Sequence, residues 1–238
     1  MREIVKLHQK YPAMGLDQIY HTIKHICSCS RGRVHRLMKQ MNIHSVRKQA
    51  YKCTTNSKHD NPISKNLLMR NFKCHTPNTI WVGDITYIPT GQGWLYLAII
   101  KDLCTKKVVG YAFSNRIDSK LTIAALNMAV RRQKPEIGCV FHSDRGVQYA
   151  SKAYRKAIKC HGLLQSMSRK GDPYDNAVAE NFFSCLKCEC VHLNHFCSRS
   201  DAQCEIFRYI EGFYNSKRPH SGINWTFPNA FEALMKSA

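Results

Sequence analysis

The chain has 238 residues and a hydrophobic content of 44%, enough for one catalytic-size domain with a packed core and a small appendage. Its apolar runs are shorter than the ~20 residues of a membrane helix, and the N-terminal segment lacks the apolar centre of a signal peptide, so we expect a cytoplasmic protein with no membrane partner. The net charge of +20 favours a polyanion as partner, most often nucleic acid.

The first third of the chain is the most densely basic part, with a net charge of +12 over residues 1–75. Within it, 16–26 and 30–42 have apolar residues at helical spacing, and the short link CSC joins them. This pattern is typical of a helix-turn-helix, whose second helix enters the major groove of DNA. That helix would be capped by Ser30 and would present three basic residues, Arg31, Arg33 and Arg36.

We assign residues 1–45 to this DNA-binding domain; a solvated helical hairpin with basic decoration is the open alternative. Residues 46–76 are polar and basic, with few apolar groups in register, and read as a linker that could lie along a phosphate backbone. Residues 77–238 form the predicted catalytic domain.

The predicted catalytic domain begins with three strand-like runs, TIWVGDITYI, WLYLAII and KVVGYAFS, the first two separated by the turn GQG. A helix is expected over 119–133, a short strand at 138–141, a helix over 150–161 and a strand at LLQSM. Helices over 173–190 and 201–215 follow. This order predicts an α/β fold with a mixed five-stranded sheet flanked by helices.

Two aspartates stand where strands seldom carry a charge. Asp84 lies inside the first predicted strand, and Asp144 ends the fourth. Because the first and fourth strands would be parallel neighbours, we expect these side chains to lie side by side. Two carboxylates in contact raise each other's pKa, and a divalent cation converts their repulsion into affinity.

A third carboxylate, Glu180, lies on the helix expected over 173–190. Val178, Phe182, Cys185 and Leu186 form the apolar face of this helix, and Glu180 points away from them. Lys187 follows after two helical turns and projects from the same side as Glu180. Taken alone, such a pair is typical of a solvated face.

The combined spacing carries a resemblance. Asp84, Asp144 and Glu180, with 35 residues between the last two and Lys187 seven beyond, resemble the signature of DDE transposases and retroviral integrases. Five words also occur in order: WVGDITYI, GWLYLAIIKDL, FHSDRGVQYAS, SMSRKGDPYDNAVAENFFSCLK and FYNSKRPHSGI. They resemble the second-frame transposase of insertion-sequence family three, and the resemblance covers residues 1–235.

The resemblance implies an RNase H-like integrase core that cuts DNA at the element's ends and joins the freed 3′-hydroxyl to target DNA. It implies that Asp84, Asp144 and Glu180 hold two Mg²⁺ ions, with Mn²⁺ able to substitute. It further implies double-stranded DNA as the partner, a homo-oligomer that pairs two ends, and a location in the bacterial cytoplasm, at the nucleoid when bound.

Other residues receive supporting roles from the same resemblance. Lys187 would contact phosphate or a terminal base, and Arg145 and Gln148 would orient the substrate. His142 would support Asp144 or, in the interpretation we favour, pack as a core histidine. Asn176 matches the family's Asp-Asn-Ala tripeptide, and the closing YN-x-x-RPH word predicts packing or contacts near the DNA end.

The sequence also departs from the family pattern. Met1 stands near the first helix, whereas family members run some tens of residues longer and are often fused to an upstream-frame product with a leucine zipper. We therefore expect this chain alone to lack end-recognition or dimerisation parts, and we expect a fusion or partnership with an upstream-frame product. Asn224-Trp225 also stands where the family has a glycine-tyrosine word.

Two rival functions and a second kind of metal site stay open. The chain could be a non-catalytic DNA-binding remnant that competes for element ends, or an RNase H-like nuclease that hydrolyses without joining. The twelve cysteines include two clusters with neighbouring histidines, but neither has the separated ligand pairs of a zinc finger, and we expect reduced thiols. The cluster members are His21, His25, Cys27 and Cys29, and Cys185, Cys188, Cys190, His192, His195 and Cys197.

Overall fold

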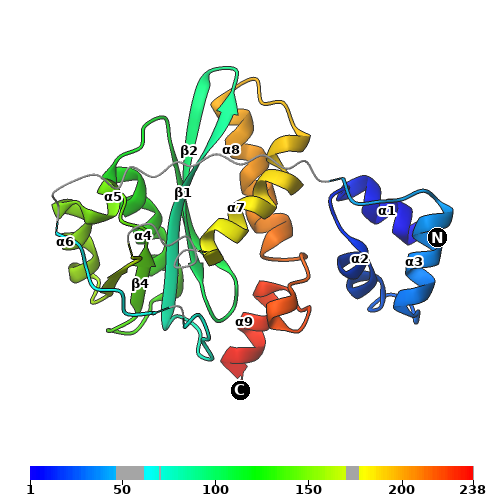
Figure 1. Cartoon of the computed structure of the whole chain (residues 1–238), viewed down its shortest axis with the longest axis horizontal. Helices are drawn as coiled ribbons and strands as arrows, with labels where there is room; N and C mark the ends of the chain where they lie inside the picture. Colours follow the sequence, from blue (N-terminus) through cyan, green and yellow to red (C-terminus); the bar gives the residue numbers. More distant parts are fainter. Residues whose placement is uncertain (47–61, 70, 170–176, 238) are drawn as a thin grey trace.

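A computed structural model describes residues 1–46, 62–69, 71–169 and 177–237. Its centre is one five-stranded mixed sheet in the order β3-β2-β1-β4-β5 (Figure 1). The first three strands pair antiparallel, and β4 and β5 run parallel to β1, which confirms the predicted RNase H-like α/β class. The strands are β1 (Ile80–Thr90), β2 (Gly93–Asp102), β3 (Val108–Ser114), β4 (Val140–Ser143) and β5 (Leu164–Met167).

The parallel pairing of β1 with β4 is the feature that positions the candidate site. The strand order predicted this parallel pairing, and its register places Trp81 opposite Phe141 and Val82 opposite His142. β3 and β4 run in the same direction on opposite sides of β2 and β1, so the chain must cross over between them, and it does so through a helix. Asp84 and Asp144 each follow the last paired residues, Val82 and His142, by two positions. Both therefore lie just beyond the same end of the paired segment.

Successive side chains of a strand point to opposite faces of the sheet, so the core has two layers, one on each face. On one face Trp81 and Phe141 pack beneath the helices of the β3–β4 and β4–β5 connections; on the other, Ile88 and Ile99 pack with the C-terminal helices. Figure 1 shows the two sets of helices on opposite sides of β1. The first set is α4 (Ser119–Gln133), α5 (Val147–Ala150) and α6 (Lys152–Cys160); the second is α7 (Ala177–Glu189) and α8 (Arg199–Phe207).

The C-terminal region differs from the predicted single helix over 201–215. α8 is followed by a π-helix, Arg208–Tyr214, in which the amide of Asn215 donates to the carbonyl of Ile210 at 2.9 Å. Spacing of apolar residues does not separate a π-turn from an α-turn, because both bury the same side of the segment. A further helix, α9 (Pro228–Ser237), closes the chain and was not predicted.

The YN-x-x-RPH word holds this C-terminal region to the rest of the fold. Arg218 forms a bidentate ion pair with Glu189 at the end of α7, with N–O distances of 2.8 and 2.7 Å. The two side chains are 9% and 5% exposed, and the hydroxyl of Tyr209 donates to the same carboxylate at 2.8 Å. The guanidinium also lies over the ring of Tyr214. The word therefore has a structural function: it ties α7 to the segment that follows the π-helix.

Both edges of the sheet have partners. Beside β5, the amide of Met167 donates to the carbonyl of Lys65 at 3.4 Å, and the amide of Leu67 donates to the hydroxyl of Ser166 at 2.9 Å. At β3, the side-chain amide of Asn215 accepts from the amide of Val108 and donates to its carbonyl, both at 3.0 Å. Segments distant in sequence thus satisfy polar groups of the edge strands.

The N-terminal helical unit consists of α1 (Arg2–Lys10), α2 (Leu16–Ile23) and α3 (Arg31–Gln40). The helix pair predicted over 16–26 and 30–42 is present with shorter bounds, and α1 was not predicted. Ser30 caps α3 as expected, accepting from the amide of Arg33 at 3.2 Å. The domain boundaries at 45 and 76 stay predictions, because 47–61 lie outside the described residues. Within the described part of the chain, none of the helices has the length and apolar character to cross a membrane.

We predict that replacing Arg218 by methionine destabilises the fold. The variant leaves Glu189 buried without its cation, and breaking a buried pair in this way costs about 3–5 kcal/mol. Chemical denaturation should show the loss in the free energy of unfolding. Arg208→Met is the matched control, because Arg208 pairs with Glu205 on the surface, where the two side chains are 69% and 41% exposed. Equal stability of the two variants would contradict the anchoring role of Arg218.

Candidate active site

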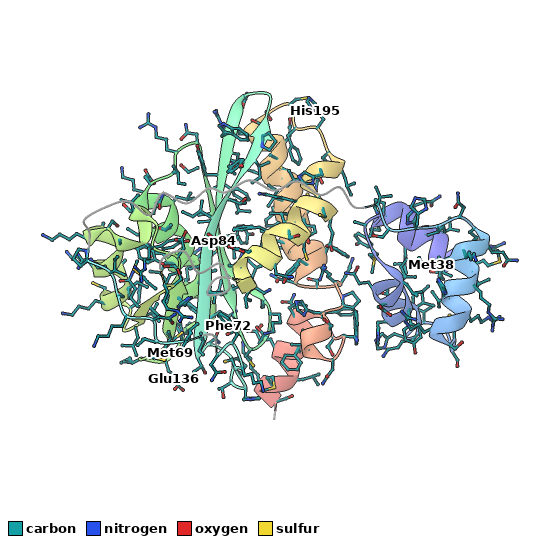
Figure 2. The ribbon with its side chains drawn as sticks, in the orientation of Figure 1. Met38, Met69, Phe72, Asp84, Glu136 and His195 are labelled. Carbon is teal, nitrogen blue, oxygen red and sulfur yellow. The ribbon has the colours of Figure 1, made fainter. Side chains whose placement is uncertain are left out.

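Asp84 lies in the middle of β1, on the side of the sheet that faces α7 (Figure 2). Its carboxylate accepts a hydrogen bond from the neighbouring amide of Ile85 at 2.8 Å. Asp102, by contrast, is 1% exposed and accepts from the amides of Asn78 and Thr105 and from the Thr105 hydroxyl. Asp102 therefore has a sufficient structural explanation as the centre of a turn, whereas the hydrogen bond to Ile85 leaves most of the acceptor capacity of Asp84 available.

Asp144 follows β4 directly and is half-buried. Its carboxylate accepts from the amide of Gly146 at 2.9 Å, in the turn that leads into α5. The turn is tight: a Cβ at Gly146 would lie 3.0 Å from the Asp144 carboxylate and 2.7 Å from the side-chain oxygen of Gln148. The turn thus holds Asp144 at the end of β4, beside β1.

Glu180 lies in the first turn of α7, on the exposed side of that helix. The buried side of α7 is formed by Ala179, Phe182, Phe183 and Leu186, so the prediction that Glu180 points away from the apolar face is confirmed. Lys187, two turns further, sends its ammonium group over the ring of Tyr87, 5.3 Å from the ring centroid. α7 therefore presents a carboxylate and a cation toward the part of β1 that holds Asp84 and Tyr87.

The charges of neighbouring carboxylates affect the protonation of Asp84 and Glu180. Burial first, then the charge of Asp144 and that of Glu180, raise the pKa of Asp84 well above its usual range, while the Ile85 amide and Lys187 oppose this. Burial and the charge of Asp144 also raise the pKa of Glu180. Burial lowers the pKa of Lys187, and the charge of Asp84 counteracts that effect. The three carboxylates and Lys187 are thus close enough for their charges to act on Asp84.

The side chains of the three carboxylates are not arranged to coordinate one metal ion together. In the described part of the chain, no three His, Cys, Asp or Glu side chains are arranged so that they could hold a metal ion. Their chemistry suits Mg²⁺, because carboxylate oxygens are its preferred protein ligands and a few suffice when water and phosphate complete the shell. Glu180 is exposed in the first turn of α7, whereas Asp84 lies within strand β1.

The residues expected to support Asp144 fall into two groups. Arg145 donates from Nε to the carbonyl of Ser168 at 2.7 Å, and Gln148 lies against the turn at Gly146, so both are near Asp144. His142 is fully buried, with Nδ1 2.8 Å from the hydroxyl of Ser166 on β5. This places His142 in the core between strands, in the position of a packed histidine. The expected contact of Asn176 falls outside the described residues.

The basic residues of α3 have different surroundings. Arg31 donates to Asp17 at 2.6 Å, which ties α3 to α2. Arg33 and Arg36 are both exposed and line a hollow together with Leu37, Lys39 and Gln40. Arg31 therefore has a role within the helix pair, and the surface open to a polyanion is centred on the other two arginines. This ion pair could not be predicted from helical spacing, because Asp17 and Arg31 lie on different helices.

Two residues of this region were not singled out from the sequence. Tyr87 supports Lys187 through its ring, and Tyr149 lies close enough to Asp84 and Asp144 for their charges to raise its pKa, after burial itself. Tyr149 is 2% exposed. An aromatic residue three positions after Asp84 was a visible signal for Tyr87, but strand aromatics are too common to mark a site on their own.

We predict that Asp84→Asn stabilises the protein in metal-free buffer at pH 7. Because the folded protein raises the pKa of Asp84, its stabilising contribution is present at low pH and is lost as pH rises through the folded-state pKa. Removing the charge should restore about 1 kcal/mol, with solvent screening at this half-buried position reducing the gain. Chemical denaturation across the pH range measures it.

Asp102→Asn is the matched control for this substitution. It should lower the free energy of unfolding, since the Thr105 donors would then face an amide group. A lower free energy of unfolding for Asp84→Asn would contradict the prediction, because it would show that other groups of the folded protein stabilise the charge of Asp84.

Comparison with known proteins places the chain in a family. Models described as "Integrase core domain" match residues 75–173 and 161–228. The crystal structure of the catalytic core domain of BIV integrase aligns with a TM-score of 0.48 at 15% identity, over 67% of this chain and 97% of that one. The HTLV-2 integrase catalytic core domain in complex with magnesium, in trimeric form, gives 0.49 at 14% identity, over 67% and 99%.

Curated proteins show closer sequence similarity. The uncharacterized 31 kDa protein of insertion element IS600 from Shigella sonnei is 45% identical over 84% of this chain and 74% of its own length. The transposase for insertion sequence element IS904 from Lactococcus lactis is 38% identical over 94% and 87%. Transposase InsF for insertion sequence IS3A from Escherichia coli is 45% identical over 73% and 60%. The chain therefore belongs to the insertion-sequence transposases with an integrase core, the family that its carboxylate spacing predicted.

Proposed function

We propose that this transposase cuts and joins DNA strands at the ends of its element with Asp84, Asp144 and Glu180 as ligands of Mg²⁺. The observation that supports this most directly is the convergence of three carboxylates where β1, β4 and α7 meet: after burial, the charges of Asp144 and Glu180 raise the pKa of Asp84, and the charge of Asp144 raises the pKa of Glu180. Such coupling is unfavourable for folding and is relieved by a divalent cation, so it marks a functional site.

When bound at these carboxylates, a pair of Mg²⁺ ions supplies an activated water and stabilises the attacking and leaving oxygens of an in-line displacement. The chain's own residues prepare for that role. Asp84 and Asp144 form the fixed part of the ligand set, and Glu180 closes the set by a change of rotamer in the first turn of α7. Lys187, held over Tyr87, neutralises charge on the phosphate beside Asp84.

The proposed reaction has two steps. Water attacks a phosphodiester at the element's end and releases a 3′-hydroxyl and a 5′-phosphate. The 3′-hydroxyl then attacks a phosphodiester of the target, forming one new ester bond and releasing the target's own 3′-hydroxyl. No side chain becomes bonded to DNA in either step, so the site needs no serine or tyrosine nucleophile.

DNA binding is assigned to the N-terminal helical unit. The exposed surface of α3 around Arg33 and Arg36 supports contact with duplex DNA, with Arg145, Gln148 and Lys187 touching the strand near the carboxylates. Because two ends must be joined, we propose a homo-oligomer assembled on DNA, with an upstream-frame product as a further partner.

We predict that neutralising any one carboxylate abolishes the chemistry without weakening DNA binding. Asp84→Asn, Asp144→Asn and Glu180→Gln should each lower strand cleavage and strand transfer by about 10³-fold or more on a labelled duplex carrying an element end, in Mg²⁺ or Mn²⁺. Glu205→Gln, on the surface of α8, should act as wild type. Chelation of divalent cations should stop both steps.

The outcomes of this assay separate the alternatives. A chain that binds ends yet shows no metal-dependent cleavage is a non-catalytic remnant, and hydrolysis without joined product indicates a nuclease. Wild-type activity in any of the three carboxylate variants would remove that residue from the ligand set.

We also predict that Arg33→Ala and Arg36→Ala weaken binding to duplex DNA. Each lost phosphate contact should reduce the slope of log affinity against log salt by about 1, while a lost base contact should relax sequence preference. Fluorescence anisotropy at several salt concentrations measures both effects. Lys120→Ala, an exposed lysine on α4, is the control. Unchanged slopes in both arginine variants would rule out this face of α3 as the DNA-contacting surface.

A further inference from the structure

Two ring contacts join the N-terminal helical unit to the region that follows α8. Tyr11, just after α1, stacks on Phe213 of the π-helix with ring centroids 4.1 Å apart and an interplanar angle of 19°. His21 of α2 stacks on Trp225 at 4.3 Å and 6°. Figure 1 shows the helical unit beside the C-terminal part of the chain. The two contacts bring together segments about two hundred positions apart in the sequence.

The backbone that presents Trp225 is in an unusual conformation. Asn224 and Trp225 both have positive φ angles, +55° and +60°. A bulky residue rarely adopts this left-handed region, and such strain persists only where the surroundings hold it. Here the amide of Trp225 donates to the carbonyl of His220 at 3.0 Å, and Thr226 pairs with His220 as a β-bridge. The loop is therefore fixed on both sides of Trp225, and it directs the indole at His21.

The contacting side chains of the helical unit are partly withdrawn from water. Burial raises the pKa of Tyr11, and burial followed by the charge of Lys24 lowers the pKa of His21, against the opposing charge of Asp17. Nδ1 of His21 is buried and has no hydrogen-bond partner in the described part of the chain. A neutral imidazole lying flat on an indole suits these surroundings. Apolar residues of both parts also belong to one continuous cluster.

The contact leaves the proposed DNA-binding surface accessible. The rings come from α2 and from the residue after α1, whereas Arg33 and Arg36 lie on α3 and line a hollow of their own. In Figure 1, α3 lies on the side of the helical unit away from the sheet. Docking of the unit is therefore compatible with DNA bound along α3.

We propose that Phe213 and Trp225 form a docking surface for the helical unit of the same chain, and that this docking sets the distance between the DNA segment held by α3 and the phosphodiester presented to Asp84, Asp144 and Glu180. The second half rests on the proposed function; the first half does not. A rigid connection restricts which phosphodiester reaches the site, because the effective concentration of neighbouring ones falls steeply when geometry is fixed.

The first experiment tests docking in the free full-length chain by small-angle X-ray scattering. Trp225→Gly removes the indole and supplies the residue that best tolerates a positive φ, so the loop should fold. Trp225→Gly and His21→Ala should each increase the radius of gyration and the maximum dimension relative to wild type. Trp225→Tyr, which retains a ring, should stay compact, and so should Phe207→Ala, an exposed aromatic on α8. Identical scattering from wild type and Trp225→Gly would overturn the docking surface.

The second experiment maps the cleaved position on an end-bearing duplex at saturating protein. Trp225→Gly and His21→Ala should bind the duplex as wild type does. They should cut the wild-type position about tenfold less and add cuts at neighbouring phosphodiesters. Unchanged precision in variants that scatter as expanded chains would overturn the distance-setting role. Absence of cleavage by wild type would overturn the proposed function, and scattering would still decide whether the unit docks.

Discussion

The site depends on one unfavourable arrangement, a carboxylate in the middle of a β-sheet beside a second carboxylate. Asp84 is brought to Asp144 because β1 and β4 pair in parallel, and that pairing is stabilised by apolar contacts such as Trp81 with its neighbours on the helical face. The large apolar layers on both faces of the sheet offset the local repulsion. The fold thus holds two like charges close together, which is what affinity for a divalent cation requires.

The third carboxylate depends on a different support. Glu180 lies near the start of α7, and the end of that helix is held by the buried pair of Glu189 with Arg218. Phe182 packs edge-on against Tyr214, in the same segment as Arg218, so polar and apolar contacts fix α7 together. The proposed closure of the ligand set by Glu180 therefore involves its side chain and leaves α7 in place. The YN-x-x-RPH word thus supports the helix that carries Glu180, through the contact of Arg218 with Glu189.

Much of the fold and part of the site could be predicted from the sequence. Strand-like runs and a helical crossover suffice to make β1 and β4 neighbours, and a spacing of seven places Glu180 and Lys187 on one face. Contacts between distant segments could not be derived, because periodicity carries no information about partners: the pair of Arg218 with Glu189 and the stacking of His21 on Trp225 are of this kind. The assignment of Asp84, Asp144 and Glu180 as metal ligands stays a prediction.

The covered edges of the sheet matter for a protein that we propose to assemble in several copies on one DNA molecule. An open edge strand offers unpaired amides and carbonyls to any similar chain nearby, and crowding favours such pairing. Asn215 occupies both polar groups of Val108 at one edge, and the carbonyl of Lys65 accepts from the amide of Met167 at the other. Copies concentrated at an element's ends are thereby discouraged from joining sheet to sheet into aggregates, so their association is left to surfaces shaped for assembly.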